Sequence, residues 1–189
     1  VYDRRVYFGF GHPQPEAALK FGPNIAEWPP IPALADNLLM QVASVLRDPV
    51  TTTDELIPSG ETSSYRSDPL KLASFALSRR DPDYVPRARA TQALEETRRS
   101  GAMPPELQSV QKALSIPDMG RVQIGSVLFA NKPGDGSARE QAASCQRVLG
   151  GCANLCYEFA TKRYRSNCVN WGMLPFTLAE GTDFPGHPG

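Results

Sequence analysis

Two stretches of the sequence combine residue types that could bind and activate an anionic ligand. The first, GDGSAREQAA at 134–143, places two glycines, Ser137 and Arg139 between a strand-like run and a helix-like run. A glycine-rich turn that enters a helix directs free backbone amides and the positive end of the helix dipole toward one point. Arg139 opposes that dipole, but its guanidinium could bind both oxygens of a carboxylate. This stretch is therefore a candidate carboxylate or phosphate site.

The same stretch also has a purely structural interpretation. Ser137 followed three residues later by Glu140 has the spacing of a capping box, in which the hydroxyl and the carboxylate satisfy amides at the start of a helix. The glycines would then only form the turn, and Arg139 would be a solvated side chain. The spacing alone leaves both interpretations open.

The second stretch is TTDELIPSGETSSYR at 52–66, within a segment at 48–69 that is rich in threonine, serine, proline and glycine. It carries Asp54 and Arg66 among many hydroxyl side chains. We predict a long irregular loop for 48–69, and long loops in compact domains are usually either functional or disordered. A solvated surface loop is the structural alternative.

The elements around these stretches indicate an α/β domain, because strands and helices alternate toward the carboxyl end. The run at 37–46 fits either a buried strand or a short helix. Helical patterns follow at 68–82, 87–101 and 104–117. The remaining sequence predicts, in order, a strand at 121–130, a helix at 138–149, a strand at 152–159, a helix at 160–171 and a strand at 173–179.

In both motif stretches the sequence resembles the aconitase family, specifically its carboxy-terminal swivelling domain. TTDELIPSGETSSYR is similar to the family segment that begins Thr-Thr-Asp and ends, at the same separation, in a substrate-binding arginine. GDGSAREQAA resembles Gly-x-Gly-Ser-Ser-Arg-Glu-His-Ala-Ala, and RVLGG and NCVNWGMLPF continue the resemblance in order. The resemblance extends from about residue 35 to 179, although the helices at 70–117 fit it poorly.

The resemblance implies a fold and a division of the chain. It implies an α/β fold, the swivelling β/β/α domain of the aconitase carboxy terminus, at 35–189. The proline-rich residues 1–34 are then expected to form an extended, linker-like segment. On this interpretation the chain is a fragment of a longer polypeptide.

The resemblance also implies roles for individual residues. Ser137 falls on the family's catalytic serine, which takes a proton from the carbon next to a substrate carboxylate. Arg139 falls on the arginine that binds this carboxylate, and Arg66 on the second arginine that binds the substrate. Three residues of the same two motifs are expected to support the site, namely Asp54, Gly134 and Gly136. Two positions depart from the family pattern: Ala138 replaces a second serine and Gln141 replaces a histidine, which puts the handling of citrate or isocitrate in doubt.

The implied reaction is the reversible dehydration and rehydration of a hydroxy-carboxylic acid, with a [4Fe–4S] cluster as Lewis acid. In the family the cluster cysteines lie in other domains, so we expect no metal site and no cofactor in this chain, and no activity from it alone. The four cysteines are spaced like neither a zinc site nor an iron–sulfur motif; they are Cys145, Cys152, Cys156 and Cys168. The expected partners are cluster-bearing domains of the same enzyme.

Two alternatives remain open at this point. The first is a separate small subunit of an isopropylmalate-isomerase-like enzyme, which would work only with a large subunit. The second is a non-catalytic RNA-binding or regulatory relative. Twenty basic residues balance twenty acidic residues, so a nucleic-acid partner is not expected. Without an apolar run near the ~20 residues of a membrane span, or a signal peptide, we expect a cytoplasmic protein without membrane contact.

Overall fold

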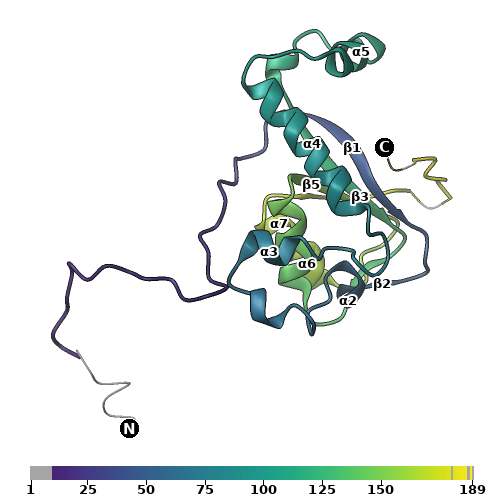
Figure 1. The fold of residues 1–189 in the computed structure, drawn as a ribbon. Helices are drawn as coiled ribbons and strands as arrows, with labels where there is room; N and C mark the ends of the chain where they lie inside the picture. The colour runs from purple at the N-terminus through teal and green to yellow at the C-terminus, as the bar shows by residue number, and fades with distance from the viewer. Residues whose placement is uncertain (1–9, 180, 187, 189) are drawn as a thin grey trace.

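The computed structural model describes residues 10–179, 181–186 and 188, which fold around a four-stranded parallel sheet (Figure 1). The strand order is β1–β3–β5–β6, and every neighbouring pair is parallel. The strands are β1 (Asn37–Leu46), β3 (Val122–Ala130), β5 (Gly151–Cys156) and β6 (Leu174–Thr177). The three strands predicted in the second half of the chain are confirmed, and the ambiguous run at 37–46 is a strand. The α/β fold class is confirmed.

Strand β3 lies at the centre of the domain, and all nine of its residues are buried. Such burial is expected for a parallel strand that is covered on both faces. Leu128 and Ala130 belong to the core beneath the helices. Val127 instead packs with residues of β5 on the opposite face, and Phe129 stacks on Phe184 with ring centroids 4.3 Å apart. Helices therefore cover one face of the sheet, while irregular segments from both ends of the chain contribute to the cover of the other.

Two of the three helical patterns in the middle of the chain correspond closely to observed helices. They form α4 (Tyr84–Arg99) and α5 (Pro105–Ala113). The pattern at 68–82 begins as predicted, with the Asp68 carboxylate accepting from the Lys71 amide at 3.0 Å, but its helix α3 ends at Ala73. The chain then passes through turns in which Leu77 takes a positive φ of 55°, a conformation that interrupts a helix.

A short second sheet forms where the sequence predicts an irregular loop. Strand β2 (Thr51–Thr52) pairs in parallel with β4 (Pro133–Asp135), and β2 leads directly into the helical turn α2 (Thr53–Leu56). The turn begins at a capping box, in which the Thr52 hydroxyl accepts from the Glu55 amide and the Glu55 carboxylate accepts from the Thr52 amide. The rest of the loop includes one further turn, η1 (Ser63–Tyr65).

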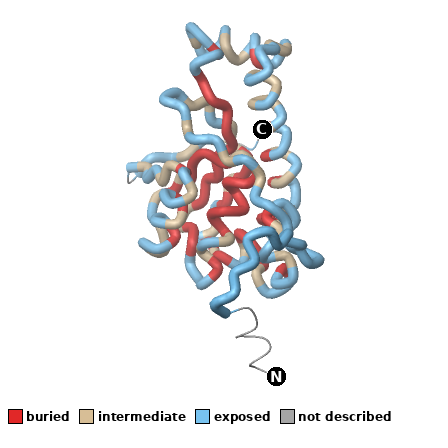
Figure 2. Tube along the Cα trace, turned by 90° about the vertical axis from the view of Figure 1, so that its left-hand side faces the viewer, coloured by how far each residue is buried: buried red, intermediate tan, exposed pale blue. Residues whose placement is uncertain are grey.

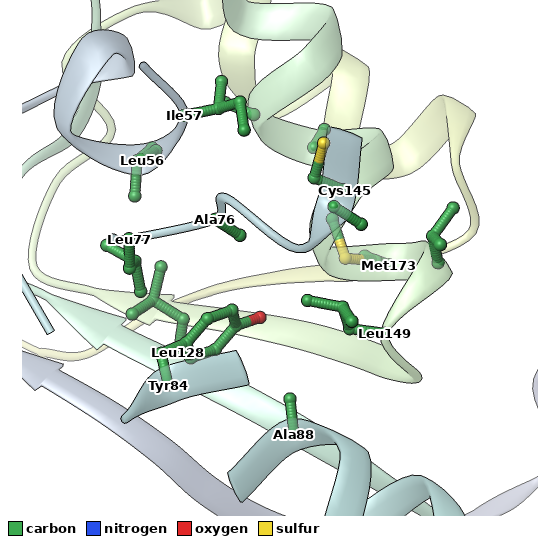
Figure 3. Close-up of a cluster of buried hydrophobic side chains, with 14 of the residues drawn as sticks. Leu56, Ile57, Ala76, Leu77, Tyr84, Ala88, Leu128, Cys145, Leu149 and Met173 are labelled. Atoms are coloured by element: carbon green, nitrogen blue, oxygen red, sulfur yellow. The ribbon is translucent and has the colours of Figure 1, made fainter. Parts of the chain in front are cut away.

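The main core lies between the sheet and the helices. Figure 2 shows the buried chain concentrated in the central strands and in the segments next to them. Figure 3 shows side chains from α2, α4, β3 and α6 converging there, among them Leu56, Ala88, Leu128 and Cys145. A smaller apolar cluster of Leu107, Met119 and Ile124 joins α5 and η2 (Met119–Arg121) to the start of β3. Among the described residues, no helix combines the length and apolar character needed to span a membrane.

Candidate functional site

The β2–β4 pairing brings the two motif stretches side by side. Thr51 pairs with Pro133 and Thr52 pairs with Asp135. Immediately beyond this pairing, the buried hydroxyl of Thr53 accepts a hydrogen bond from the Ala138 amide at 3.3 Å. The beginning of the 52–66 motif therefore contacts the turn that carries Ser137, although the contacting residues are 85 positions apart in sequence.

The two glycines of the turn allow this close packing. Gly134 has a φ of +96°, and a Cβ atom there would lie 2.3 Å from the ring of Tyr164. Gly136 has a φ of +126°, and its Cβ would lie 2.4 Å from the Thr53 hydroxyl oxygen. Because L-residues rarely adopt these φ values and no Cβ can be that close, both positions require glycine. The glycines are therefore part of the packing as well as of the turn.

Ser137 lies exposed at the end of this turn, just before helix α6 (Arg139–Val148). The capping box that Ser137 and Glu140 could have formed is absent, since the N-cap residue Ala138 has no side-chain hydrogen bond and Glu140 binds other partners. The Ser137 hydroxyl is thus not used to cap α6. It lines a surface cavity of about 390 Å³ between the amino-terminal ends of α6 and α7 (Lys162–Asn170).

The cavity is rich in positive charge. Arg139 lines it from α6, and Lys162 and Arg163 line it from the first turn of α7. Glu140 is the one carboxylate among the lining residues. Within residues 10–179 these three cations form no ion pair; Arg139 donates to the Gly136 carbonyl oxygen. The remaining lining residues are Ser166 and Asn167. An anion is the ligand that this cavity suits best.

Of the residues predicted from the sequence, Ser137 and Arg139 share this cavity, whereas Arg66 and Asp54 do not line it. The exposed Arg66 guanidinium makes a long 3.5 Å contact with the Ser59 carbonyl oxygen. Asp54 forms an ion pair with Arg79, which also binds Glu61 at 2.6 Å. The structure thus joins the start of the 52–66 motif to the Ser137 turn and directs the side chain of Asp54 to a surface ion-pair network.

Sequence reasoning did not assign Lys162 and Arg163 to the site. The available signal was the pair of basic residues directly after Thr161, whose hydroxyl caps α7 by accepting from the Tyr164 amide at 3.2 Å. Two basic residues in the first turn oppose the helix dipole, as Arg139 does in α6. The same argument that selected Arg139 could therefore have selected them.

A closed ring of buried hydrogen bonds supports the turn from below. The Tyr164 hydroxyl accepts from the Gln146 side chain and donates to Asn154, and Asn154 donates back to Gln146, each at 2.9 Å. These residues come from α7, α6 and β5, and all three are buried. The ring orients Tyr164, whose aromatic ring lies against Gly134, and so links the turn to the core.

The residues that the structure describes do not form a site for a metal cluster. All four cysteines are free and buried, and the described residues contain no group of three potential metal ligands. Burial raises the pKa of Cys145, Cys156 and Cys168 to about 12 each, so these thiols stay protonated at neutral pH. They pack as small apolar side chains.

A larger cavity of about 750 Å³ lies elsewhere, at the start of β1 and η2. Its lining comes from the segments 36–39 and 114–118 together with Arg121 and Val122. None of the predicted site residues lines it. The Ser137 cavity is smaller and more open, but it is the one in which candidate reactive side chains meet.

Comparison with known proteins matches the part of the chain that carries the Ser137 cavity; the 52–66 motif lies outside the matched profile. The profile of the aconitase C-terminal domain matches residues 106–181. The chain is also 43% identical, over 63 residues, to aconitate hydratase A of Bradyrhizobium diazoefficiens. That similarity covers 33% of this chain and 7% of the relative, so the matched part is a small portion of the larger protein.

Proposed function

We propose that this chain, whose residues 106–181 match the carboxy-terminal domain of the aconitase family, provides the proton-transferring serine and part of the carboxylate-binding site of a hydro-lyase. The substrate class is a hydroxy-carboxylic acid, and the reaction is its reversible dehydration. One observation carries the proposal. The β2–β4 pairing joins the two motifs beside a cation-lined cavity that contains both Ser137 and Arg139.

In this proposal Ser137 is the base. Its deprotonated oxygen takes the proton from the carbon next to a substrate carboxylate, and the electron pair of that C–H bond forms the new double bond as the hydroxyl leaves. In hydration the Ser137 hydroxyl returns the proton. A serine hydroxyl is too weakly acidic to serve as a base in water, so its anion needs strong stabilisation. The nearby amino terminus of α6 and the cations of the cavity could provide it.

Arg139 is the proposed ligand of the substrate carboxylate, because a guanidinium can donate two parallel hydrogen bonds to its oxygens. Arg66 is the proposed second anion ligand. Its exposed guanidinium lies outside the Ser137 cavity, so it would bind a part of the substrate that extends beyond that cavity. Asp54 would act indirectly, since it pairs with Arg79, which also binds Glu61 in the segment that carries Arg66.

We further propose that residues 35–189 form the swivelling domain and residues 1–34 a linker. The groups that assist departure of the hydroxyl, including any iron–sulfur cluster, would come from other domains or from a partner subunit. The domain would then supply the base and the carboxylate-binding arginines to a composite site. Its own residues supply no cluster ligand in this scheme.

The test is a hydration and dehydration assay on the native protein that contains this chain. Formation of the unsaturated product from a panel of hydroxy-di- and tricarboxylic acids is followed by ultraviolet absorbance. Ser137→Ala should lower kcat by about 10²–10⁴-fold, because a positioned base contributes that much, with little change in KM. Arg139→Lys should mainly raise KM, because the ammonium cannot replace the paired guanidinium contacts.

Ser109→Ala is the matched control, because Ser109 is an exposed serine on α5. Ser109→Ala should leave kcat and KM unchanged. If Ser137→Ala kept more than about a tenth of the wild-type rate, Ser137 would not be the general base.

A further inference from the structure

Glu140 is unusual among the cavity residues because neutral donors occupy both of its carboxylate oxygens. One oxygen accepts from the Trp171 indole N–H at 2.6 Å, and the other accepts from the Asn167 side-chain amide. Asn167 lies in the last turn of α7, and Trp171 is the C-cap residue of that helix. Glu140 therefore links the start of α6 to the end of α7, and it is held there without an ion pair to a described cation.

Trp171 is itself held by the amino-terminal segment. Its ring stacks on Trp28, with centroids 4.8 Å apart and planes inclined by 29°. Residues 25–32, which we call the strap, contact the domain on both sides of Trp28. On one side the Ala26 amide donates to the Ser67 carbonyl oxygen at 2.9 Å, and on the other the Pro32 carbonyl oxygen accepts from Arg147. In Figure 1 this segment passes beside α3 and α7 before it reaches β1.

The position of Glu140 matters for the charge of the cavity. Arg139, Lys162 and Arg163 line the same cavity as this carboxylate. If Glu140 lost its neutral donors, its side chain could swing toward these cations and pair with one of them. A tethered carboxylate has an effective local concentration in the millimolar range, so it would compete with a carboxylate ligand for the same cations.

We propose that Trp171, supported by Trp28 of the strap, is a positioning residue that holds the Glu140 carboxylate away from the cations of the Ser137 cavity and so keeps them available for a ligand carboxylate. The carboxylate class of the ligand rests on the proposed function. The positioning of Glu140 rests on the contacts alone. Neither tryptophan touches the ligand in this proposal; both act through Glu140.

The test compares carboxylate binding in four forms of the chain, with tricarballylate as the probe because it has three carboxylates and no hydroxyl to eliminate. Binding is followed by the ¹H–¹⁵N shifts of the amides at 137–140. Trp171→Phe keeps an aromatic ring against Trp28 but removes the N–H donor, so the dissociation constant should rise about three- to five-fold. In a Glu140→Gln background the same substitution should change the dissociation constant less than two-fold, because residue 140 then has no negative charge that could pair with the cations of the cavity.

This dependence on residue 140 separates positioning from a general loss of structure. If Trp171 only supported packing, Trp171→Phe would weaken binding equally in both backgrounds, and the proposal would be wrong. Binding that is unaffected by Trp171→Phe, or the absence of any shift at 137–140, would also overturn it. Should Trp171→Phe fail to fold, Asn167→Ala removes the other donor and should give the same pattern, including the rescue by Glu140→Gln.

The contribution of the strap can be tested separately. Trp28 and Trp171 are the two tryptophans of the chain, so their stacking can be followed by circular dichroism. Trp28→Ala should abolish the near-ultraviolet circular dichroism of the stacked pair and weaken tricarballylate binding about two-fold, again only when Glu140 is present. Retention of full affinity would remove the strap from the proposal. Failure of the serine assay described above would refute the proposed function while leaving this binding result intact, so the two can fail separately.

Discussion

The turn at 134–140 and the segment at 59–66 carry the two proposed ligand-binding arginines, and the structure holds them in different ways. The turn packs on groups that are almost completely buried, Tyr164 at 0% and Thr53 at 2% exposure. The segment is held largely by contacts at the surface, including the Arg79–Glu61 ion pair and the long contact of Arg66 with Ser59. Core packing thus determines where Ser137 and Arg139 lie, whereas Arg66 depends on solvated contacts.

This difference suggests a division of roles between the two regions. A general base must be held accurately relative to the bond that it attacks, and rigid support supplies that accuracy. An arginine that binds a distant carboxylate can move to meet it, because long side chains tolerate a range of positions. Substitutions that disturb the turn should therefore be costly for stability, and substitutions around the segment should be mild.

The largest effect is expected at Gly134. In Gly134→Ala the new methyl group would lie 2.3 Å from the Tyr164 ring, at a φ of +96°. Overpacking and a strained backbone act together there, so the free energy of unfolding should fall by about 3 kcal/mol or more. Urea denaturation followed by far-ultraviolet circular dichroism measures this change.

Gly172→Ala is the matched control for that substitution. Gly172 also has a positive φ, +70°, but a Cβ atom added there would meet no other group within 4 Å. Only the backbone preference is lost, at a cost of about 1 kcal/mol. Equal effects at the two glycines would mean that Tyr164 does not pack against the turn as described.

Tyr164→Phe should have an intermediate effect, because it removes one hydroxyl from the buried ring of hydrogen bonds. Asn154 would lose a donor and Gln146 an acceptor, both within the core. Leaving buried polar groups unsatisfied should lower the free energy of unfolding by about 2 kcal/mol. Tyr65→Phe, at a partly exposed tyrosine outside this ring, should change it by less than about 0.5 kcal/mol. An equally small effect at Tyr164 would show that the ring contributes nothing to stability.

The sequence predicts the elements that carry the site better than it predicts their contacts. Strand β3 and helix α6 are recognisable because a long apolar run and a glycine-bounded helical pattern are local signals. The β2–β4 pair is not recognisable, since strands of two and three residues have no periodicity and their pairing depends on the whole fold. The same holds for Glu140, whose local spacing suggests a capping box while its partners come from α7.

The position of Arg66 relative to Ser137 is a further case in which local sequence is insufficient. The family resemblance predicts that both bind one ligand, but their separation is determined by the loop between α2 and α3. That loop has few buried anchors, among them Thr62, whose hydroxyl donates to the Pro58 carbonyl oxygen at 2.9 Å. The placement of Arg66 is therefore a property of tertiary contacts that no spacing rule encodes.

The smallest effect on stability is expected at Arg79, which joins Asp54 and Glu61 at the surface. Hydrogen bonding to Glu61 is the largest influence that raises the pKa of Arg79, so the guanidinium stays charged at all working pH values. Because solvent and salt screen such exposed pairs, Arg79→Ala should destabilise the chain less than Tyr164→Phe does. Its effect should instead appear as faster backbone motion at 59–66, measured by ¹⁵N relaxation, with the turn at 134–140 unchanged. Arg99→Ala, at an exposed arginine at the end of α4, is the control. Faster motion in both regions would show that the two arginine-bearing regions are not supported independently.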